Sequence, residues 1–407
     1  MSFDYSAVLS ARAAAAASPF KGYPPYHFVG GNIDEPSLPA AALADAVGKV
    51  LRAEGHDMAK YGMESGPQGY LPLREFICDN LKRRAAMTVS PDEVLITTGS
   101  LQAMDLVNEA LLEPGDVVVL EGANYGGALT RLRRLGVDFV GVDLDEGGMR
   151  MDSLRAAMEE LKSQGRKPKM IYTIPTVQNP TGTVMSRDRR LEMLQIARDY
   201  DVPIFEDDCY ADLIWEGERP PAIHSLDTDG RVIYCATFSK TIAPALRVGY
   251  IVAPWAVLKH ILPLKTDAGS GALEQMVLAE YLPSNFDNHV NGLLPILKQK
   301  AEAMTQTLDE HFGAAAEYEK PIGGIYIWVT LPKQVDTRKL FAAASAEGIA
   351  INPGPEWTVD GEANKHRMRL CFGHPSVENI REGVAKLADV CHREFGVPLT
   401  SGNVERG

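Results

Sequence analysis

The fold is decided by "EVLITTGSLQAMDLVNEALL", residues 93–112, and by "DVVVLEG", residues 116–122, which follows it. The stretch opens with a predicted strand, continues with apolar residues at helical spacing, and leads into a second predicted strand. Both strands are apolar throughout and do not alternate with polar residues. Such runs, separated by a helix, indicate a mainly parallel sheet that helices cover on both faces.

The same alternation of strands and helices continues along the chain. Further strands are predicted over residues 138–144, 169–175, 202–208, 231–239 and 247–254. Amphipathic helices are predicted over 152–164 and 186–201, between several of these strands. The fold class is therefore α/β, with a large domain built on one central sheet.

The pattern of predicted strands and helices changes after about residue 290. We expect a long helix over 293–312, two strands over 323–331 and 366–373 that pair with each other, and a closing helix over 376–395 that Ser376 caps. This pattern predicts a large domain over 46–290 and a small α+β domain made of 1–45 with 291–407. A short helix is expected over 11–18, and the tail 401–407 is a candidate for disorder.

The composition excludes several classes of function. Asp and Glu number 54 against 41 Lys and Arg, so the net charge of −13 argues against a nucleic acid partner. The five cysteines are odd in number and lack CxxC spacing, which fits neither a disulfide framework nor a metal site. We interpret the alanine run at 11–18 as a short helix, with a signal peptide as the alternative, and no apolar run reaches membrane-spanning length. We expect a soluble cytoplasmic protein without a metal or membrane partner.

Polar residues follow several strands at the edge where an α/β sheet binds its ligands. Ser100 begins a helix whose free N–H groups suit a phosphate, although a plain N-cap is the alternative. Asn179 precedes a proline that holds its backbone extended, which also fits an ordinary turn. Asp207 and Asp208 end an apolar strand, where a carboxylate needs a cationic partner unless it caps the next element.

The stretch "TFSKTIAPALRVGY", residues 237–250, supplies what those loops lack. Its hydroxyls at Thr237 and Ser239 and the guanidinium of Arg247 would bind a dianionic phosphate together with the helix start. Lys240 could attack a carbonyl of the same ligand, and the acidic strand end could face a ring nitrogen. A solvated surface lysine is the alternative for Lys240 alone, but together the four loops describe a site for pyridoxal 5′-phosphate (PLP).

The motifs "QNPTG", "EDDCY", "FSKTIAPALRVGY" and "GGIYIWV" are specific as a set, and the match runs from about residue 61 to 373. With them the chain resembles the fold-type I PLP-dependent aminotransferases of class I/II, and within them the kynurenine and α-aminoadipate aminotransferase group. The resemblance implies the PLP-transferase fold type I, with a large domain on a mainly parallel sheet and a small α+β domain. It also implies a homodimer with shared active sites.

The resemblance assigns a role to each matching residue. Lys240 would hold the cofactor as a Schiff base and carry a proton, and Asp207 would keep the pyridine nitrogen protonated. Tyr210 and Asn179 would donate hydrogen bonds to the phenolic oxygen of the ring, on which Tyr125 would stack. The residues expected at the phosphate are Ser100, Leu101 through its backbone, Thr237, Ser239, Arg247 and, from the neighbouring subunit, Tyr61.

The substrate side depends on an arginine and on the N-terminal segment. Arg369 matches the arginine that grips the α-carboxylate, while Arg367 lies on the same strand face by period two. Asn179 and Gly31 are also expected to contact the substrate. The chain departs from the group at Leu101, where glutamine is common, and in "GGNIDEPSLP", residues 30–39, the segment that closes over the substrate. Lys21 falls where relatives carry an arginine, although a surface lysine is the plainer interpretation.

The expected activity is transfer of an amino group from an L-amino acid with an aromatic, aminoadipate-like or long aliphatic side chain. The acceptor would be a 2-oxo acid, 2-oxoglutarate on grounds of the resemblance, in a ping-pong cycle. A PLP-dependent lyase, decarboxylase or oxidase on the same scaffold is the alternative. A non-catalytic effector-binding regulator is a distant one, because the segment before residue 61 is apolar and not basic.

Overall fold

The computed structural model of the protein describes residues 3–5, 8–10, 13, 17 and 19–399. The helix predicted over 11–18 and the disorder predicted for 401–407 therefore fall largely or wholly outside the described residues. Among the described residues, no helix combines the length and the apolar character that crossing a bilayer requires.

A seven-stranded sheet forms the centre of the larger part of the chain. In spatial order its strands are β2 (Val94–Thr97), β10 (Gly249–Val252), β9 (Val232–Thr237), β8 (Ile204–Asp207), β7 (Met170–Thr173), β3 (Val117–Glu121) and β4 (Asp138–Val142). Every predicted strand is present, and β10 alone runs against its neighbours. The predicted mainly parallel sheet is thus confirmed.

Helices cover both faces of this sheet, as the apolar strands predict. They are α2 (Leu71–Ala85), α3 (Ser100–Leu111), α4 (Gly126–Leu135), α5 (Met151–Ser163), α6 (Arg187–Asp199), the short α7 (Ile223–Leu226) and α8 (Trp255–Ile261). Alternate residues of β3 serve opposite faces: Val118 packs in a core with α3 and α4, whereas Val119 packs in another with α5 and α6. A hairpin of β5 (Leu144–Asp145) and β6 (Gly148–Met149) lies beyond β4.

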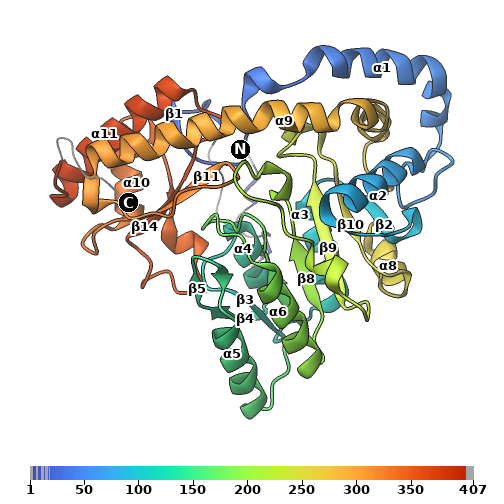
Figure 1. Ribbon diagram of the computed structural model, residues 1–407, viewed down its shortest axis with the longest axis horizontal. Coiled ribbons are helices and arrows are strands. Elements are labelled where there is room, and N and C mark those ends of the chain that lie inside the picture. The colour runs from blue at the N-terminus through green and yellow to red at the C-terminus, as the bar shows by residue number, and fades with distance from the viewer. Residues whose placement is uncertain (1–2, 6–7, 11–12, 14–16, 18, 400–407) are drawn as a thin grey trace.

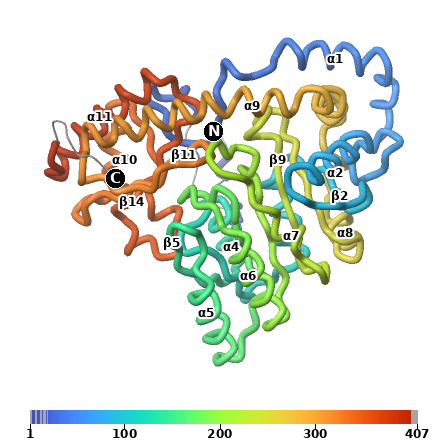
Figure 2. Tube along the Cα trace, viewed as in Figure 1, coloured from blue at the N-terminus to red at the C-terminus, as the bar shows by residue number. Residues whose placement is uncertain are grey.

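The longest helix, α9 (Ala272–His311), links two hydrophobic cores (Figures 1 and 2). Its first half packs with α2, and its second half packs with α11 (Val377–Phe395). The predicted helix begins only at residue 293, whereas the observed one starts 21 residues earlier, at 272, and contains Pro283 and Pro295. Prolines destabilise a helix, so they weaken the helical pattern in the local sequence. The burial of α9 in both cores outweighs this cost.

The second core belongs to a smaller sheet and its helices. Its strands are β11 (Tyr326–Thr330), β14 (Arg367–Cys371) and β13 (Asn352–Pro353), with α10 (Thr337–Ala346) and α11 alongside. The predicted pairing is confirmed, since β11 and β14 are antiparallel with Trp328 opposite Arg369. The Ser376 cap is also confirmed, because its hydroxyl accepts a hydrogen bond from the Asn379 N–H at 3.1 Å.

The N-terminal segment joins both cores. Strand β1 (Tyr26–His27) pairs with β12 (Ile349–Ala350) beside the smaller sheet, while α1 (Ala40–Glu54) packs along α9. We propose that the domains follow these cores, with 46–290 as the large unit and 1–45 with 291–407 as the small one. The boundary at residue 290 falls inside α9, so the two units share a continuous helix.

Gly249 lets β10 lie directly against the start of α3. A Cβ atom at this position would come within 2.7 Å of the Gly99 carbonyl carbon and the Ser100 nitrogen. We predict that Gly249→Ala lowers the free energy of unfolding by about 1–3 kcal/mol through overpacking. Urea unfolding followed by circular dichroism measures the loss.

Gly292 provides the matched control for this change. It is exposed within α9, and a Cβ atom there would meet nothing within 4 Å. Gly292→Ala is expected to raise stability by about 0.5–1 kcal/mol, because alanine loses less backbone entropy in a helix. Equal urea midpoints for Gly249→Ala and the wild type would contradict the close approach of β10 to α3.

Candidate active site

A cavity of about 270 Å³ opens at the carboxyl ends of the parallel strands. Eleven of the residues predicted for the site line it: Gly31, Ser100, Leu101, Tyr125, Asn179, Asp207, Tyr210, Ser239, Lys240, Arg247 and Arg369. Ser100, Asn179 and Lys240 follow β2, β7 and β9 respectively, and Asp207 is the last residue of β8. Arg247 precedes β10, and the reversed direction of that strand brings its beginning to the same edge.

Lys240 points its amine into this cavity. Its Nζ donates a hydrogen bond to the Gly31 carbonyl at 3.0 Å and lies 5.8 Å from the ring centre of Tyr210. Burial lowers the pKa of Lys240 below its usual value, and the nearby guanidinium groups of Arg369 and Arg247 lower it further against the opposing effect of two cysteines. The amine therefore has an increased neutral, nucleophilic fraction.

Asp207 presents one oxygen that has no partner. Its Oδ2 accepts a hydrogen bond from the Tyr172 hydroxyl at 2.8 Å, while its buried Oδ1 accepts none within the described residues. Burial raises the pKa of Asp207, although hydrogen bonds from Cys209 and Tyr172 oppose the rise, and the adjacent Asp208 adds to it. A protonated ring nitrogen would satisfy that oxygen and favour the charged carboxylate. Asp208 turns away and pairs with Arg219 at 2.7 Å.

The opposite end of the cavity suits a phosphate. Ser100 is the first residue of α3, so the backbone N–H groups of that turn are available to an anion. The side chain of Arg247 lies across this turn and donates to the Thr98 carbonyl at 3.2 Å. Gly99 has a φ of +79°, and a Cβ there would lie 2.3 Å from Arg247 Nη2, so only glycine leaves room for the guanidinium.

Arg369 connects three parts of the cavity wall. Its Nη1 donates to Asn179 Oδ1 at 3.0 Å, and its Nη2 donates to the Gly30 carbonyl at 3.2 Å. The guanidinium carbon lies 3.8 Å from the ring centre of Trp357, and its buried Nε has no partner among the described residues. A stacked guanidinium with a free donor fits a planar carboxylate.

A buried carboxylate fixes the loop that carries Tyr125. Glu121 accepts hydrogen bonds from the Thr173 hydroxyl at 2.7 Å and from Asn124 Nδ2 at 2.6 Å. Asn124 in turn accepts one from the Tyr125 N–H at 2.6 Å. Burial raises the pKa of Glu121 to about 7, although the Thr173 hydrogen bond opposes the rise. The position of the Tyr125 ring thus depends on a chain of interactions that begins at the end of β3.

Two predicted residues do not line the cavity. The Thr237 hydroxyl is buried, donates to the Val248 carbonyl at 3.0 Å and lies 2.9 Å from Ser239 Oγ. Tyr61 is 91% exposed and lies in a separate cavity of about 710 Å³ beside Lys265. Their contacts with a phosphate stay predictions. Lys21 is an exposed side chain, in keeping with the plainer interpretation of that residue.

Several lining residues were not predicted from the sequence. They are Gly30, Ile174, Cys209, Asn352 and Trp357. Cys209 lies inside the "EDDCY" motif, where its position directly after the acidic pair was an available signal. Asn352 lies on the two-residue strand β13 and Trp357 ends a short 3₁₀ helix (Gly354–Trp357), and no local pattern marks either residue. The buried amide of Asn352 also has an unpartnered Nδ2, so it is available to a ligand.

The N-terminal segment covers the cavity and is anchored on both sides. Before the cover, β1 pairs with β12. After it, Asp34 forms an ion pair with Lys300 of α9 at 2.5 Å, and both side chains are less than a tenth exposed. Lys300 also donates to the Gly373 carbonyl at 3.0 Å. The carbonyls of Gly30 and Gly31 are therefore held over Arg369 and Lys240.

The chain is similar to known aminotransferases over most of its length. A sequence profile described as aminotransferase class I and II matches residues 31–387. The chain is 33% identical over 362 residues to the aromatic-amino-acid aminotransferase 1 of Thermococcus litoralis, and the match covers 88% of this chain and 86% of that relative.

Solved structures extend this similarity to the fold. A kynurenine aminotransferase of Pyrococcus horikoshii, in complex with PMP, has a TM-score of 0.86 at 33% identity and covers 91% of each chain. The α-aminoadipate aminotransferase LysN of Thermus thermophilus, complexed with N-(5′-phosphopyridoxyl)-L-leucine, has a TM-score of 0.82 at 33% identity. That comparison covers 90% of this chain and 91% of the other.

We predict that Lys300→Met destabilises the protein by about 3–5 kcal/mol, because it leaves the Asp34 carboxylate buried without its cation. Burial raises the pKa of Asp34, but hydrogen bonds from Lys300 and Ser37 outweigh it and hold the pKa below its usual value. The stabilisation is therefore complete at neutral pH and is lost as the pH falls through the folded pKa. Urea unfolding at several pH values measures both effects.

Lys49→Met is the matched control, since Lys49 pairs with Glu280 and also ties an N-terminal element to α9. That pair is largely exposed, with Lys49 67% exposed, so its loss should cost at most about 1 kcal/mol. Equal losses in the two variants would contradict the anchoring role of Lys300.

Proposed function

The chain belongs to the aminotransferase class I and II family, and from this premise we propose which of its residues carry out the reaction and on which substrates. It is a PLP-dependent enzyme that transfers an amino group from an amino acid to an oxo acid. One observation carries the residue assignment: a partly buried amine, an unpartnered carboxylate oxygen and a stacked guanidinium line the same cavity.

The cofactor, when bound, supplies an electron-withdrawing ring that stabilises negative charge at the α-carbon of the substrate. Lys240 would hold it covalently through Nζ, and this amine, once free, would take the proton from the substrate α-carbon and carry it to the cofactor. This work requires a neutral amine, and the lowered pKa of Lys240 increases that form. Asp207 Oδ1 accepts the hydrogen bond of the ring nitrogen, while Tyr172 fixes the other oxygen.

The roles of the remaining site residues follow from the hydrogen-bond donors that each has available for the cofactor or the substrate. Asn179 uses its oxygen to bind Arg369, which leaves its Nδ2 as a donor toward the phenolic oxygen, beside the Tyr210 hydroxyl. Ser100, Ser239, Arg247 and the Leu101 backbone bind the phosphate, and Thr237 orients Ser239 through their hydrogen bond. Tyr125 stacks on the ring. Arg369 takes the α-carboxylate of the substrate, with the Gly31 backbone covering it.

The donor is an L-amino acid with an aromatic, aminoadipate-like or long aliphatic side chain. Relatives that act on aromatic amino acids and on aminoadipate support this range, as does the tryptophan that lines the cavity. The acceptor is 2-oxoglutarate. Both substrates carry an α-carboxylate for the same arginine, so they bind in turn in a ping-pong cycle.

We further propose a homodimer that shares its active sites and resides in the cytoplasm. Tyr61 is 91% exposed in the single chain and is available to reach the cofactor phosphate of a neighbouring subunit. All five cysteines are free thiols, which suits a reducing compartment.

An amino-donor panel with 2-oxoglutarate as acceptor tests the substrate assignment. We expect phenylalanine, kynurenine, 2-aminoadipate and leucine to form glutamate, with cofactor absorbance changing when donor is added alone. A lyase would instead release ammonia without requiring an acceptor. Lys240→Ala should lower kcat by at least about 10²–10⁴-fold, because it removes the proton-transferring group. Lys259→Ala, an exposed lysine of α8, should retain wild-type kcat.

Mixing two inactive variants tests the shared sites. In a hybrid dimer of Tyr61→Ala with Lys240→Ala, one site regains both intact residues if Tyr61 serves the partner. Reassembly of an equal mixture should then restore about a quarter of wild-type activity, since half of the dimers are hybrids with one intact site each. If Tyr61 serves its own subunit, mixing restores nothing, and if it serves no site, Tyr61→Ala is already active by itself.

A further inference from the structure

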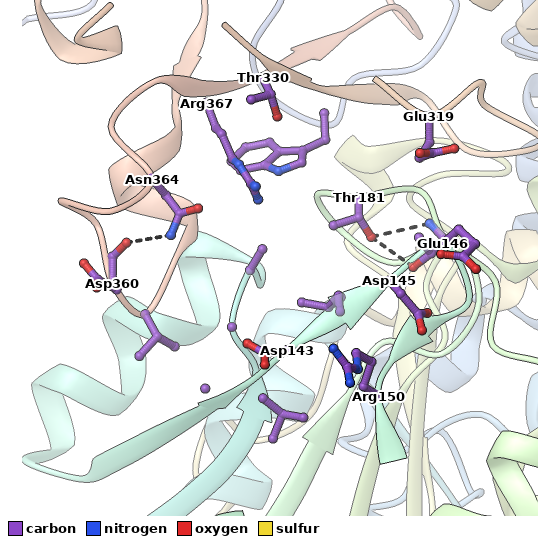
Figure 3. Close-up of a pocket in the computed structure, with 18 of the residues that line it drawn as sticks. Asp143, Asp145, Glu146, Arg150, Thr181, Glu319, Thr330, Asp360, Asn364 and Arg367 are labelled. Atoms are coloured by element: carbon purple, nitrogen blue, oxygen red, sulfur yellow. Dashed lines mark hydrogen bonds between the residues drawn. The ribbon is translucent and has the colours of Figure 1, made fainter. Parts of the chain in front are cut away.

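A second cavity, of about 740 Å³, lies between the two units (Figure 3). The β4–β6 region contributes Asp143, Glu146 and Arg150 to one wall, and β11 and β14 contribute Thr330 and Arg367 to the other. Backbone hydrogen bonds from Asn124 N to Trp357 O, at 2.8 Å, and from Val359 N to Gly122 O, at 2.9 Å, separate it from the active site. The activity proposed above leaves this cavity without a role.

Unpartnered polar atoms mark both cavities. Among the described residues, ten buried side-chain nitrogen or oxygen atoms have no hydrogen-bond partner. Three of them belong to Asp207, Asn352 and Arg369 of the active-site cavity, where ligand groups are expected. Two belong to Trp328 and Arg367, which line the second cavity. The feature that indicates a ligand in the first cavity is therefore present in the second.

The unpartnered atoms of the second cavity are both donors. They are Nε1 of Trp328, a side chain only 8% exposed, and Nε of Arg367. Trp328 and Arg367 lie on the paired strands β11 and β14, and no carboxylate lies within ion-pair distance of Arg367 in the described residues. Burial lowers the pKa of Arg367, and the charge of Glu317 opposes this shift. The guanidinium is thus desolvated, and no carboxylate among the described residues pairs with it closely. This wall calls for an anionic acceptor.

The remaining lining is rich in carboxylates. Six carboxylate residues line the cavity against two arginines. Asp145 is held by Arg189 in a bidentate pair at 2.6 and 2.7 Å. The side-chain oxygens of Asp143, Glu146 and Glu319 make no hydrogen bond or ion pair within the described part of the chain, and all three residues lie at the mouth. This side attracts ammonium groups, and the excess of carboxylates favours more than one.

We propose that this cavity is a second binding site and that it takes a basic α-amino acid. The carboxylate of the ligand binds Arg367 and Trp328, and its two cationic groups lie among Asp143, Glu146 and Glu319. Such a ligand satisfies the two buried donors and balances the acidic mouth in one molecule. Because it contacts both units, its binding is linked to their relative arrangement.

Arg367 and Arg369 lie two residues apart on β14 and line different cavities, which makes them a matched pair for the test. Titration calorimetry of the holoenzyme with L-lysine measures the affinity. We expect Arg367→Met to weaken binding of L-lysine at least about tenfold, because a charge-assisted hydrogen bond is lost. Arg369→Met, which removes a guanidinium that lines the active-site cavity and not the second one, should retain this binding with unchanged cofactor absorbance. Cadaverine, which lacks a carboxylate and so is no substrate for the active site, should bind more weakly than L-lysine.

The opposite wall gives an independent variant. Glu146→Gln with Glu319→Gln removes two charges at the mouth and should weaken L-lysine binding, whereas Glu109→Gln, an exposed charge of α3 outside the cavity, should not. The proposal is overturned if wild-type enzyme does not bind L-lysine at millimolar concentration. It is equally overturned if binding survives both Arg367→Met and the double variant, or disappears in Arg369→Met alone, which would place the amino acid in the active site. These outcomes concern binding and are independent of whether the enzyme turns over.

Discussion

The guanidinium of Arg369 is the interaction on which the organisation of the active site depends. It extends from β14 of the smaller sheet, stacks on Trp357, and hydrogen-bonds both to Asn179 after β7 and to the Gly30 carbonyl of the N-terminal segment. One side chain thereby joins three parts of the chain that are distant in sequence. Its planar geometry allows these contacts simultaneously, which a lysine ammonium could not reproduce. The side chain that we propose binds the substrate carboxylate thus also contacts Asn179 and the N-terminal segment.

Burial is the largest cause of the unusual electrostatics in the cavity. It lowers the pKa of Lys240 and raises the pKa of Asp207, so both groups are shifted toward their neutral forms before a ligand arrives. The cofactor of this family carries complementary charges, a dianionic phosphate and a ring cation, which we propose pair with Arg247 and Asp207. The site is thus preorganised for a molecule with separated charges, and the cost of desolvating the protein groups is met during folding.

The sequence predicted the site best where a recognisable strand is followed directly by residues with distinctive chemistry. Each strand of the large sheet was predicted because it is apolar throughout, and the loops after those strands named Ser100, Asn179, Asp207 and Lys240. Asn352 and Trp357 were not predicted, because they lie on a two-residue strand and a short 3₁₀ helix that only tertiary packing brings to the cavity. The first 21 residues of α9 were not predicted as helix, because Pro283 weakens the helical pattern of the local sequence. Packing in two cores stabilises the helix there despite this proline. Period two placed Arg367 and Arg369 on one face, but it could not show that the backbone contacts between residues 122–124 and 357–359 divide that face between two cavities.

The continuity of α9 has a consequence for how the protein responds to stress. Residues from its two halves are buried in separate cores, and no loop interrupts the 40 residues between Ala272 and His311. A local opening of either core exposes apolar residues of the helix that also supports the other. The free energies of unfolding of the two cores are therefore linked through a common helix. Heat or denaturant should unfold both cores in a single cooperative transition, although the chain is organised in two units.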